Sequence, residues 1–187
     1  MRVIAGSAKG RTLGAPRGSA TRPATDRIRE TLFAILEPII ADARVLDLFA
    51  GAGTLGIEAL SRGAARVTFV ERSAEALKTL RKNIRTTEFE DHAEVIGANV
   101  LGFLEQSIAG PYDVVFCDPP FADVALLEAT LAHPRLAGAL ATDASLVARV
   151  HKKHQPRVPD GARVQRVKDI GEESLLFLRY DGGRGGG

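Results

Sequence analysis

Short apolar runs alternate along most of the chain with stretches whose apolar residues recur at helical spacing. Runs of about five to seven mostly apolar residues are typical of strands buried on both faces of a sheet. The predicted strands of this kind cover 45–49, 66–71, 93–97, 112–118 and 145–150. Helical spacing predicts helices over 25–39, 54–60, 73–87, 99–109 and 123–132, with a shorter piece near Leu136.

Two later segments, 162–167 and 174–180, alternate apolar and polar residues, and they predict a closing pair of strands joined by a turn. Seven strands alternating with helices predict an α/β fold with a doubly wound, mostly parallel seven-stranded sheet. Ligands of such sheets bind beyond the carboxyl ends of the strands. We therefore look for functional residues where the predicted strands end.

The N-terminal region precedes this alternation. Apolar pairs on either side of a turn-rich stretch at 6–10 predict a small β-hairpin over 2–13, and a linker with two prolines and two glycines follows. The sequence thus predicts an N-terminal hairpin and linker over 1–24, one main domain over 25–180, and a disordered glycine-rich tail over 181–187.

Composition limits the class of protein. A chain of 187 residues, 45% of them hydrophobic, is long enough for one domain with a full α/β core. No apolar run approaches the roughly 20 residues that cross a bilayer, and the first residues lack the apolar core of a secretory signal. With one cysteine, Cys117, no internal disulfide can form. We expect a cytoplasmic monomer without a metal site, because four scattered histidines and one cysteine have no ligand spacing.

Charge is distributed unevenly. Residues 1–29 carry seven basic side chains and one acid, although the formal net charge of the chain is only +2. A basic arm on a mildly acidic body indicates a polyanionic partner, and the alternative is a solvated leader. The candidate nucleic-acid contacts are Arg2, Lys9, Arg11, Arg17 and Arg22.

A glycine-rich turn joins the strand 45–49 to the helix that follows. Gly51-x-Gly53-x-x-Gly56 matches a dinucleotide-binding pattern, which alone is weak evidence. Glu71 ends the next strand, 20 residues after Gly51, and its carboxylate could accept hydrogen bonds from both ribose hydroxyls. The pattern fits a nicotinamide enzyme or an S-adenosylmethionine enzyme. Asp47 favours the second, because a carboxylate in this strand suits a cationic ligand group such as an ammonium.

Asp118-Pro119-Pro120-Phe121 ends the fourth long apolar run. The Asp118 carboxylate and the Pro119 carbonyl could each accept a hydrogen bond from an exocyclic amine and aim its lone pair at a methyl donor. Phe121 could stack on an unpaired or flipped-out base. The alternative is a turn that merely ends a strand.

Two further side chains are ambiguous or inert. Asn99 could hydrogen-bond a cofactor adenine, could cap the next helix, or could do both. Cys117 is interpreted as a small buried hydrophobic residue rather than a nucleophile.

The motifs VLDLFAGAGTLGIEALSRGA, VERS and DPPF resemble class I S-adenosylmethionine-dependent methyltransferases. Together with GSAKGRTL and RPATDRIRETLF, the resemblance narrows to the RsmD family of bacterial 16S ribosomal RNA guanine-N2 methyltransferases. It covers the chain except the glycine tail. It implies a sheet whose last strand is antiparallel, S-adenosylmethionine as cofactor, and the small ribosomal subunit or its assembly intermediate as substrate.

Site residues follow from the resemblance position by position. Asp118, Pro119 and Phe121 would hold the target base, and the start of the first long helix, near Thr25 and Arg27, would approach the cofactor carboxylate. The positions expected to line the cofactor are Asp47, Ala50, Gly51, Gly53, Thr54, Glu71, Arg72, Asn99 and Val100.

Other functions remain open at this stage. The same chemistry could act on a DNA adenine or a protein glutamine amide, although the basic arm favours a structured nucleic acid. A nicotinamide-dependent oxidoreductase and a non-catalytic RNA-binding assembly factor are the alternatives of other classes, and the intact Asp118–Phe121 motif argues against the assembly factor.

Overall fold

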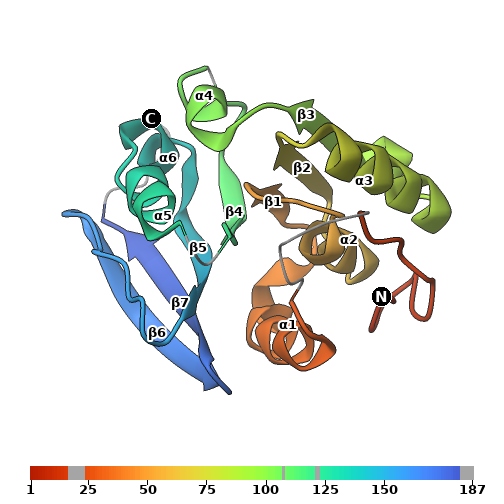
Figure 1. Cartoon of the computed structure of the whole chain (residues 1–187), viewed down its shortest axis with the longest axis horizontal. Coiled ribbons are helices and arrows are strands. Elements are labelled where there is room, and N and C mark those ends of the chain that lie inside the picture. The colour runs from red at the N-terminus through yellow and green to blue at the C-terminus, as the bar shows by residue number, and fades with distance from the viewer. Residues whose placement is uncertain (17–23, 107, 121–122, 182–187) are drawn as a thin grey trace.

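A computed structural model of the chain describes residues 1–16, 24–106, 108–120 and 123–181. Its centre is one sheet of seven strands in the order β3-β2-β1-β4-β5-β7-β6 (Figure 1). Strands β1 to β5 run parallel to one another, and β7 runs antiparallel to both β5 and β6. The strands are β1 (Arg44–Asp47), β2 (Arg66–Glu71), β3 (Ala93–Gly97), β4 (Tyr112–Cys117), β5 (Leu140–His151), β6 (Ala162–Ile170) and β7 (Glu173–Tyr180).

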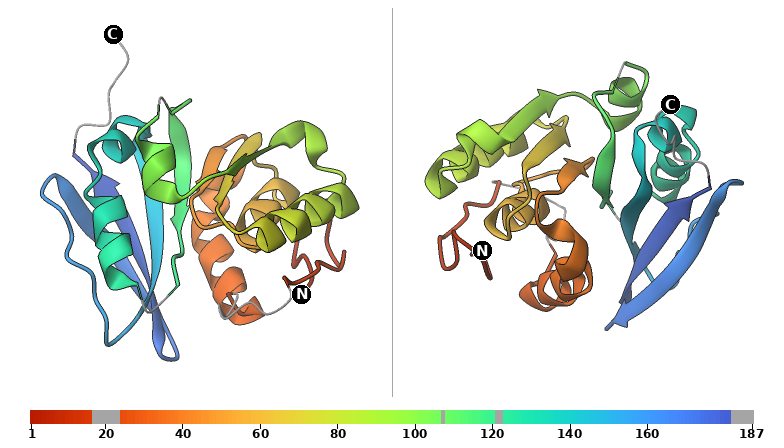
Figure 2. Two further views of the ribbon diagram at one scale, coloured as in Figure 1. Left: turned by 45° about the horizontal axis from the view of Figure 1, so that its top comes forward. Right: turned by 180° about the vertical axis from the view of Figure 1, so that it is seen from behind.

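Helices cover both faces of the sheet (Figures 1 and 2). On one face, α1, α2 and α3 enclose a core that includes Phe33, Phe69 and Phe116, and on the other face α4, α5 and α6 enclose a second core. The helices are α1 (Asp26–Ile40), α2 (Thr54–Ser61), α3 (Ala74–Thr87), α4 (Val100–Leu104), α5 (Val124–Leu131) and α6 (Pro134–Gly138). The predicted doubly wound sheet with an antiparallel last strand is therefore confirmed.

Several predicted boundaries are wrong. The helix expected over 99–109 ends at Leu104, because the Gln106 amide bonds to the Phe103 carbonyl, three residues back, in place of continuing the helical ladder. Strand β1 stops at Asp47, where the chain turns into the glycine loop. Strand β5 is longer than predicted, because its first residues pair with β4 ahead of a register shift. No helix among the described residues is both long and apolar enough to cross a membrane.

The N-terminal segment does not form the predicted hairpin of two strands. A single antiparallel bridge joins Arg2 to Thr12, and the Val3 amide donates to the Arg11 carbonyl at 3.0 Å. Val3, Ala8 and Leu13 are nevertheless buried in the core on the α1 face. The segment is a compact loop whose apolar side chains pack on the main domain, so it is part of the fold rather than a free leader. The predicted linker lies mostly, and the tail almost wholly, outside the described residues.

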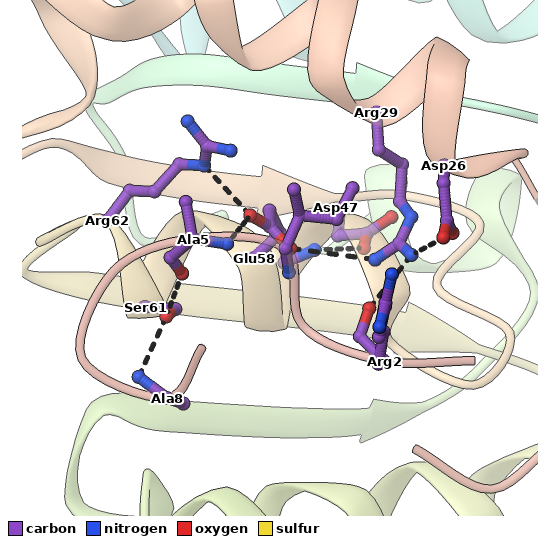
Figure 3. A network of polar contacts seen from close by, with 11 residues as sticks. Arg2, Ala5, Ala8, Asp26, Arg29, Asp47, Glu58, Ser61 and Arg62 are labelled. Atoms are coloured by element: carbon purple, nitrogen blue, oxygen red, sulfur yellow. Dashed lines mark hydrogen bonds and ion pairs between the residues drawn. The ribbon is translucent and has the colours of Figure 1, made fainter. Parts of the chain in front are cut away.

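We call the described N-terminal segment, residues 1–16, the arm. Glu58 of α2 is the buried residue that anchors it (Figure 3). Its carboxylate accepts the backbone amides of Ile4 at 2.8 Å and Ala5 at 3.0 Å, and the Arg62 Nε at 2.9 Å. The fully buried Arg29 of α1 lies 3.5 Å from the same carboxylate, and it donates to the Arg2 carbonyl at 2.9 Å. One ion pair inside the protein thus ties the arm, α1 and α2 together.

Two more contacts fix the arm. Gly6 lies so close to the end of α2 that a Cβ there would sit 1.7 Å from the Ser61 carbonyl oxygen. The Asn83 amide of α3 accepts from the Gly14 amide at 2.8 Å, and it donates to the carbonyls of Gly14 and Ala52 at 3.1 and 2.9 Å. Since Ala52 belongs to the glycine loop, Asn83 links the arm to that loop.

We predict that Glu58→Ala lowers the free energy of unfolding by about 3 kcal/mol, because two backbone amides lose their acceptor and the buried Arg29 charge keeps only one carboxylate partner, Asp26 at 2.7 Å. Urea unfolding followed by circular dichroism measures this change. Glu30→Ala, which removes an exposed acid of α1, is the control and should leave stability within about 0.5 kcal/mol. Equal midpoints for the two variants would contradict the anchoring role of Glu58.

Candidate active site

The site is built where β1 and β4 end side by side. Asp47 lies opposite Phe116 in the parallel pairing, and the Leu48 amide donates to the Phe116 carbonyl at 3.0 Å. The glycine loop begins directly after β1, and Asp118 directly follows β4. Because neighbouring strands lie about 4.8 Å apart, this pairing brings the two sequence motifs to one edge of the sheet.

The three glycines of the loop serve different purposes. A Cβ on Gly53 would meet Leu80 at 2.3 Å, and one on Gly56 would meet the Phe69 ring at 2.2 Å, so these two glycines permit close packing. Gly51 has a φ of +55°, and a Cβ there would meet nothing within 4 Å. Its bare backbone faces open space beyond the carboxyl edge, which suits close approach of a ligand.

Glu71 closes one side of this space. Its carboxylate accepts the Gly51 amide at 2.9 Å and the Ser73 amide at 2.7 Å. These two bonds fix its orientation and leave further lone pairs, so it can still accept hydrogen bonds from a vicinal diol such as a ribose. The adjacent Arg72 side chain is exposed. A half-exposed carboxylate beside an open glycine backbone fits the adenosine part of S-adenosylmethionine.

Asp47 lies beneath the loop and is 1% exposed. Its Oδ2 accepts the Gly56 amide at 3.2 Å, which ties the start of α2 to β1. Burial raises the pKa of Asp47 to about 7, and repulsion from Asp118 and Glu71 adds to the rise, while the bonds from the Gly56 and Phe49 amides oppose it. A nearby cation would favour the ionised form of this carboxyl.

Asn99 caps α4, as one of its two predicted roles required. Its side chain accepts the Gly102 amide at 2.7 Å. The Ala98 amide donates to the Glu71 carbonyl at 3.1 Å, so Asn99 begins its helix beside the end of β2. The following Val100 is buried, as are Ala50 and Thr54 in and after the glycine loop. An adenine contact for Asn99 stays a prediction.

Asp118 has a partner that sequence reasoning missed. The Arg149 Nε on β5 donates to its Oδ1 at 2.7 Å, and the Arg149 Nη1 donates to Glu173 at 3.2 Å. Burial raises the pKa of Asp118, and Arg149 opposes that rise. The available signal was an arginine within an apolar run, Ser145–Val150, where an ionic side chain needs a partner.

A small pocket, with a cavity volume of about 10 Å³, opens beside this pair, between α1 and the strands β4, β5 and β7. Ala24, Ile28, Leu55, Asp118 and Arg149 are among its lining residues. A space of this size holds about one water molecule, so it is an apolar recess beside the Asp118–Arg149 pair and not a cavity already sized for a base.

The other residues of the Asp118 motif stand as follows. Pro119 is buried and Pro120 is exposed. Phe121, expected to stack on the base, lies outside the described residues. The neighbouring Cys117 is buried, and burial raises the pKa of its thiol, so the prediction of a small hydrophobic residue is confirmed.

The predicted RNA-binding residues differ in their surroundings. Arg2 and Lys9 are exposed on the arm. Arg11 is paired with Glu88 at 2.8 Å and donates to the Thr86 carbonyl at 2.6 Å, so its charge is largely neutralised. Arg17 and Arg22 lie outside the described residues.

The start of α1, predicted to approach the cofactor, is regular. Thr25 caps the helix by accepting the Ile28 amide at 3.3 Å, and Arg27 in its first turn is exposed. Contact of either residue with a cofactor carboxylate stays a prediction.

Comparisons with known proteins agree with this geometry. Residues 1–179 match the family model described as conserved hypothetical protein 95. The Escherichia coli (strain K12) ribosomal RNA small subunit methyltransferase D is 40% identical over 182 residues, which cover 97% of this chain and 90% of that protein. The Haemophilus influenzae protein of the same name is 46% identical over 123 residues, covering 65% and 64%.

Solved structures extend the likeness to the fold. The Escherichia coli protein yhhF superposes with a TM-score of 0.84 at 37% identity, covering 97% of this chain and 98% of that one. An RNA methyltransferase of Salinibacter ruber in complex with S-adenosyl-L-homocysteine shares the fold, with a TM-score of 0.64 at 16% identity, covering 83% and 92%. Given a family match along 1–179 and 40% identity over nearly its whole length, the chain belongs to the RsmD family.

Proposed function

We propose that this protein transfers a methyl group from S-adenosylmethionine to the exocyclic N2 of a guanine in the 16S ribosomal RNA of the small subunit. The observation that carries the proposal is the meeting of the glycine loop and Asp118 at the ends of adjacent, paired strands. The 40% identity to a ribosomal RNA small subunit methyltransferase supports the RNA substrate. That likeness also makes DNA adenine, a glutamine amide and a nicotinamide reaction weaker alternatives.

The cofactor would lie across the edge of the sheet. Glu71 would accept the ribose hydroxyls, and Gly51 would give the ligand room to approach the backbone. Asp47 beneath the loop would attract the ammonium of the methionine part. The ammonium would in turn favour the ionised form of this carboxyl, which burial disfavours. When bound, S-adenosylmethionine supplies a methyl group on a sulfonium, and transfer breaks the S–C bond with its electron pair left on sulfur.

Asp118 and the Pro119 carbonyl would hold the target amine. Two acceptors fix both N–H bonds, so that the nitrogen lone pair points at the methyl carbon and forms the new N–C bond. The amine then carries a surplus proton, which leaves to Asp118 or to water. Phe121 would stack on the flipped-out base.

The RNA would cross the arm. Arg2 and Lys9 are exposed there, and phosphate contacts from such side chains position a nucleic acid without reading its sequence. Gly14 is linked to Ala52 of the glycine loop through Asn83, and Ala24 lines the pocket beside Asp118, so described residues on either side of 17–23 lie at the site.

We further infer that the protein acts as a monomer in the cytoplasm. The edge strand β6 carries the exposed cations Arg163, Arg166 and Lys168, and such charges oppose pairing with the edge of another sheet. The single cysteine, Cys117, is buried and suits a reducing compartment.

Asp118→Asn should slow methyl transfer by about 10- to 100-fold, since a charge-assisted hydrogen bond contributes about 1.5–3 kcal/mol. Binding of S-adenosylhomocysteine should change by less than about threefold. Tritium transfer to small subunits from cells lacking this protein, with calorimetry alongside, measures both. Asp143→Asn, at an exposed acid, is the control. A fully active Asp118→Asn protein would refute the proposed site.

Affinity for S-adenosylhomocysteine should fall about tenfold between pH 8 and pH 6. The pKa of Asp47 is about 7 in the free protein, and a bound ammonium lowers it. Affinity is therefore highest at a pH well above 7, where Asp47 is ionised before binding, and it falls as the pH drops through 7. Asp47→Asn should remove this dependence, whereas Glu75→Gln on the exposed start of α3 should keep it. A pH-independent affinity of the unmodified protein would disprove the link to Asp47.

Lys9→Gln should reduce the slope of log affinity against log salt for 16S RNA by about 1, as expected for one phosphate contact. Arg11→Gln should reduce it less, because Glu88 already neutralises Arg11. Filter binding at several salt concentrations provides the slopes. Equal slopes for Lys9→Gln and the unmodified protein would show that Lys9 does not contact an RNA phosphate.

A further inference from the structure

The pocket beside Asp118 has an unusual wall. Its lining residues from α1, α2, β4, β5 and β7 are apolar except for Asp118 and Arg149. The Arg149 side chain is 8% exposed and that of Asp118 is 15% exposed. An arginine buried in an apolar wall is costly unless it is paired, so its presence calls for a physical reason.

The sheet register brings Arg149 to Asp118. Ala148 of β5 lies opposite Cys117 of β4, so the residues that follow each of them are neighbours at the carboxyl edge. The β5–β7 pairing sets His151 opposite Glu173, which brings a second carboxylate to the same edge. Arg149 therefore bridges two acids, at 2.7 Å from Asp118 and 3.2 Å from Glu173.

We infer that Arg149 is a positioning residue for the transfer reaction, because it holds one oxygen of Asp118 and thereby leaves the other oriented as the acceptor for the target amine. The inference rests on the proposed function of Asp118. The Arg149 Nε donates to Oδ1 of Asp118, whereas within the described part of the chain no hydrogen bond is made to Oδ2 of Asp118. The planar guanidinium makes one bond to Asp118 and a second to Glu173, so it is held more rigidly than a flexible ammonium would be, and its bond to Asp118 keeps one direction.

The charge of Arg149 matters as much as its shape. Burial raises the pKa of Asp118, and a protonated carboxyl would present an O–H donor to the amine in place of an acceptor. Arg149 lowers the pKa of Asp118, whereas Glu173 on the far side of Arg149 raises it. The two partners therefore act on Asp118 in opposite directions.

Other titratable groups also surround Asp118. Asp47 at the end of β1 interacts with it electrostatically. His151 and His154, on and after β5, line a second pocket together with Pro119 and Arg149. Since these groups stay unchanged in variants of Arg149 and Glu173, differences between the variants isolate the effect of the bridge.

The test compares Arg149→Met and Glu173→Gln in single-turnover methyl transfer from pH 5.5 to 9. The reaction needs ionised Asp118, so its rate falls as pH drops through the pKa of Asp118. Arg149→Met should move this acid limb upward by about one pH unit or more and lower the rate at neutral pH, with recovery at high pH. Glu173→Gln should move it downward, and Arg149→Lys should lie between Arg149→Met and the unmodified protein. At each pH, the affinity of each variant for S-adenosylhomocysteine should stay within about threefold of that of the unmodified protein, so the titration of Asp47 affects all of them alike.

Arg179→Met is the matched control. Arg179 also lies in the sheet and pairs with an acid, Asp143 at 3.0 Å, but that pair is on the surface near the start of β5. Its acid limb should coincide with that of the unmodified protein.

Carbon NMR of the labelled Asp118 carboxyl follows the same titration without substrate, so it tests the bridge even if the unmodified protein methylates no RNA, a result that would refute only the proposed function. Opposite displacements for Arg149→Met and Glu173→Gln support the inference. Displacement in one direction for both, or an equal loss of rate at every pH without displacement, would overturn it and leave Arg149 a structural residue. If Arg149→Met does not fold, the direction found for Glu173→Gln decides.

Discussion

The parallel pairing of β1 with β4 is the constraint on which the site depends. It joins two segments about 70 residues apart in sequence, Asp47 facing Phe116, and thereby fixes where the glycine loop and the Asp118 motif lie. Taken alone, the glycine loop could be only the start of a helix, and the Asp118 motif only a turn that ends a strand. At the ends of paired strands they face the same space. The pairings of β2 with β1 and of β5 with β4 then add Glu71 and Arg149 to that edge.

Charges of opposite sign are separated on the molecule. Asp47, Glu71, Asp118 and Glu173 gather at the carboxyl edge of the sheet, and among them Arg149 is bound to two of the four. A surplus of acidic side chains there suits a cofactor that bears a sulfonium and an ammonium. The exposed cations of the arm suit phosphates, which the acidic edge would repel. The two ligands of the reaction are thus drawn to different places.

Sequence periodicity predicted the strands, their order of alternation and the loops that end them, because buried parallel strands require continuous apolar runs and ligand loops require glycines. It could not predict that residues 2–13 form a docked loop. The contact of Ile4 with Glu58 and that of the adjoining Gly14 with Asn83 span 54 and 69 residues and leave no local pattern. Arg149 was missed for the same reason, since only the β4–β5 register shows that an arginine in an apolar strand meets Asp118.

The docked arm also has a consequence for the order of folding during synthesis. Its residues are translated before their partners, which are Glu58 on α2, and Asn83 and Thr86 on α3. The arm therefore has nowhere to pack until most of the first half of the chain has emerged, at about 5–20 residues per second. The arm therefore joins the fold only after α2 and α3 are available, although Val3 and Leu13 precede both helices in the sequence.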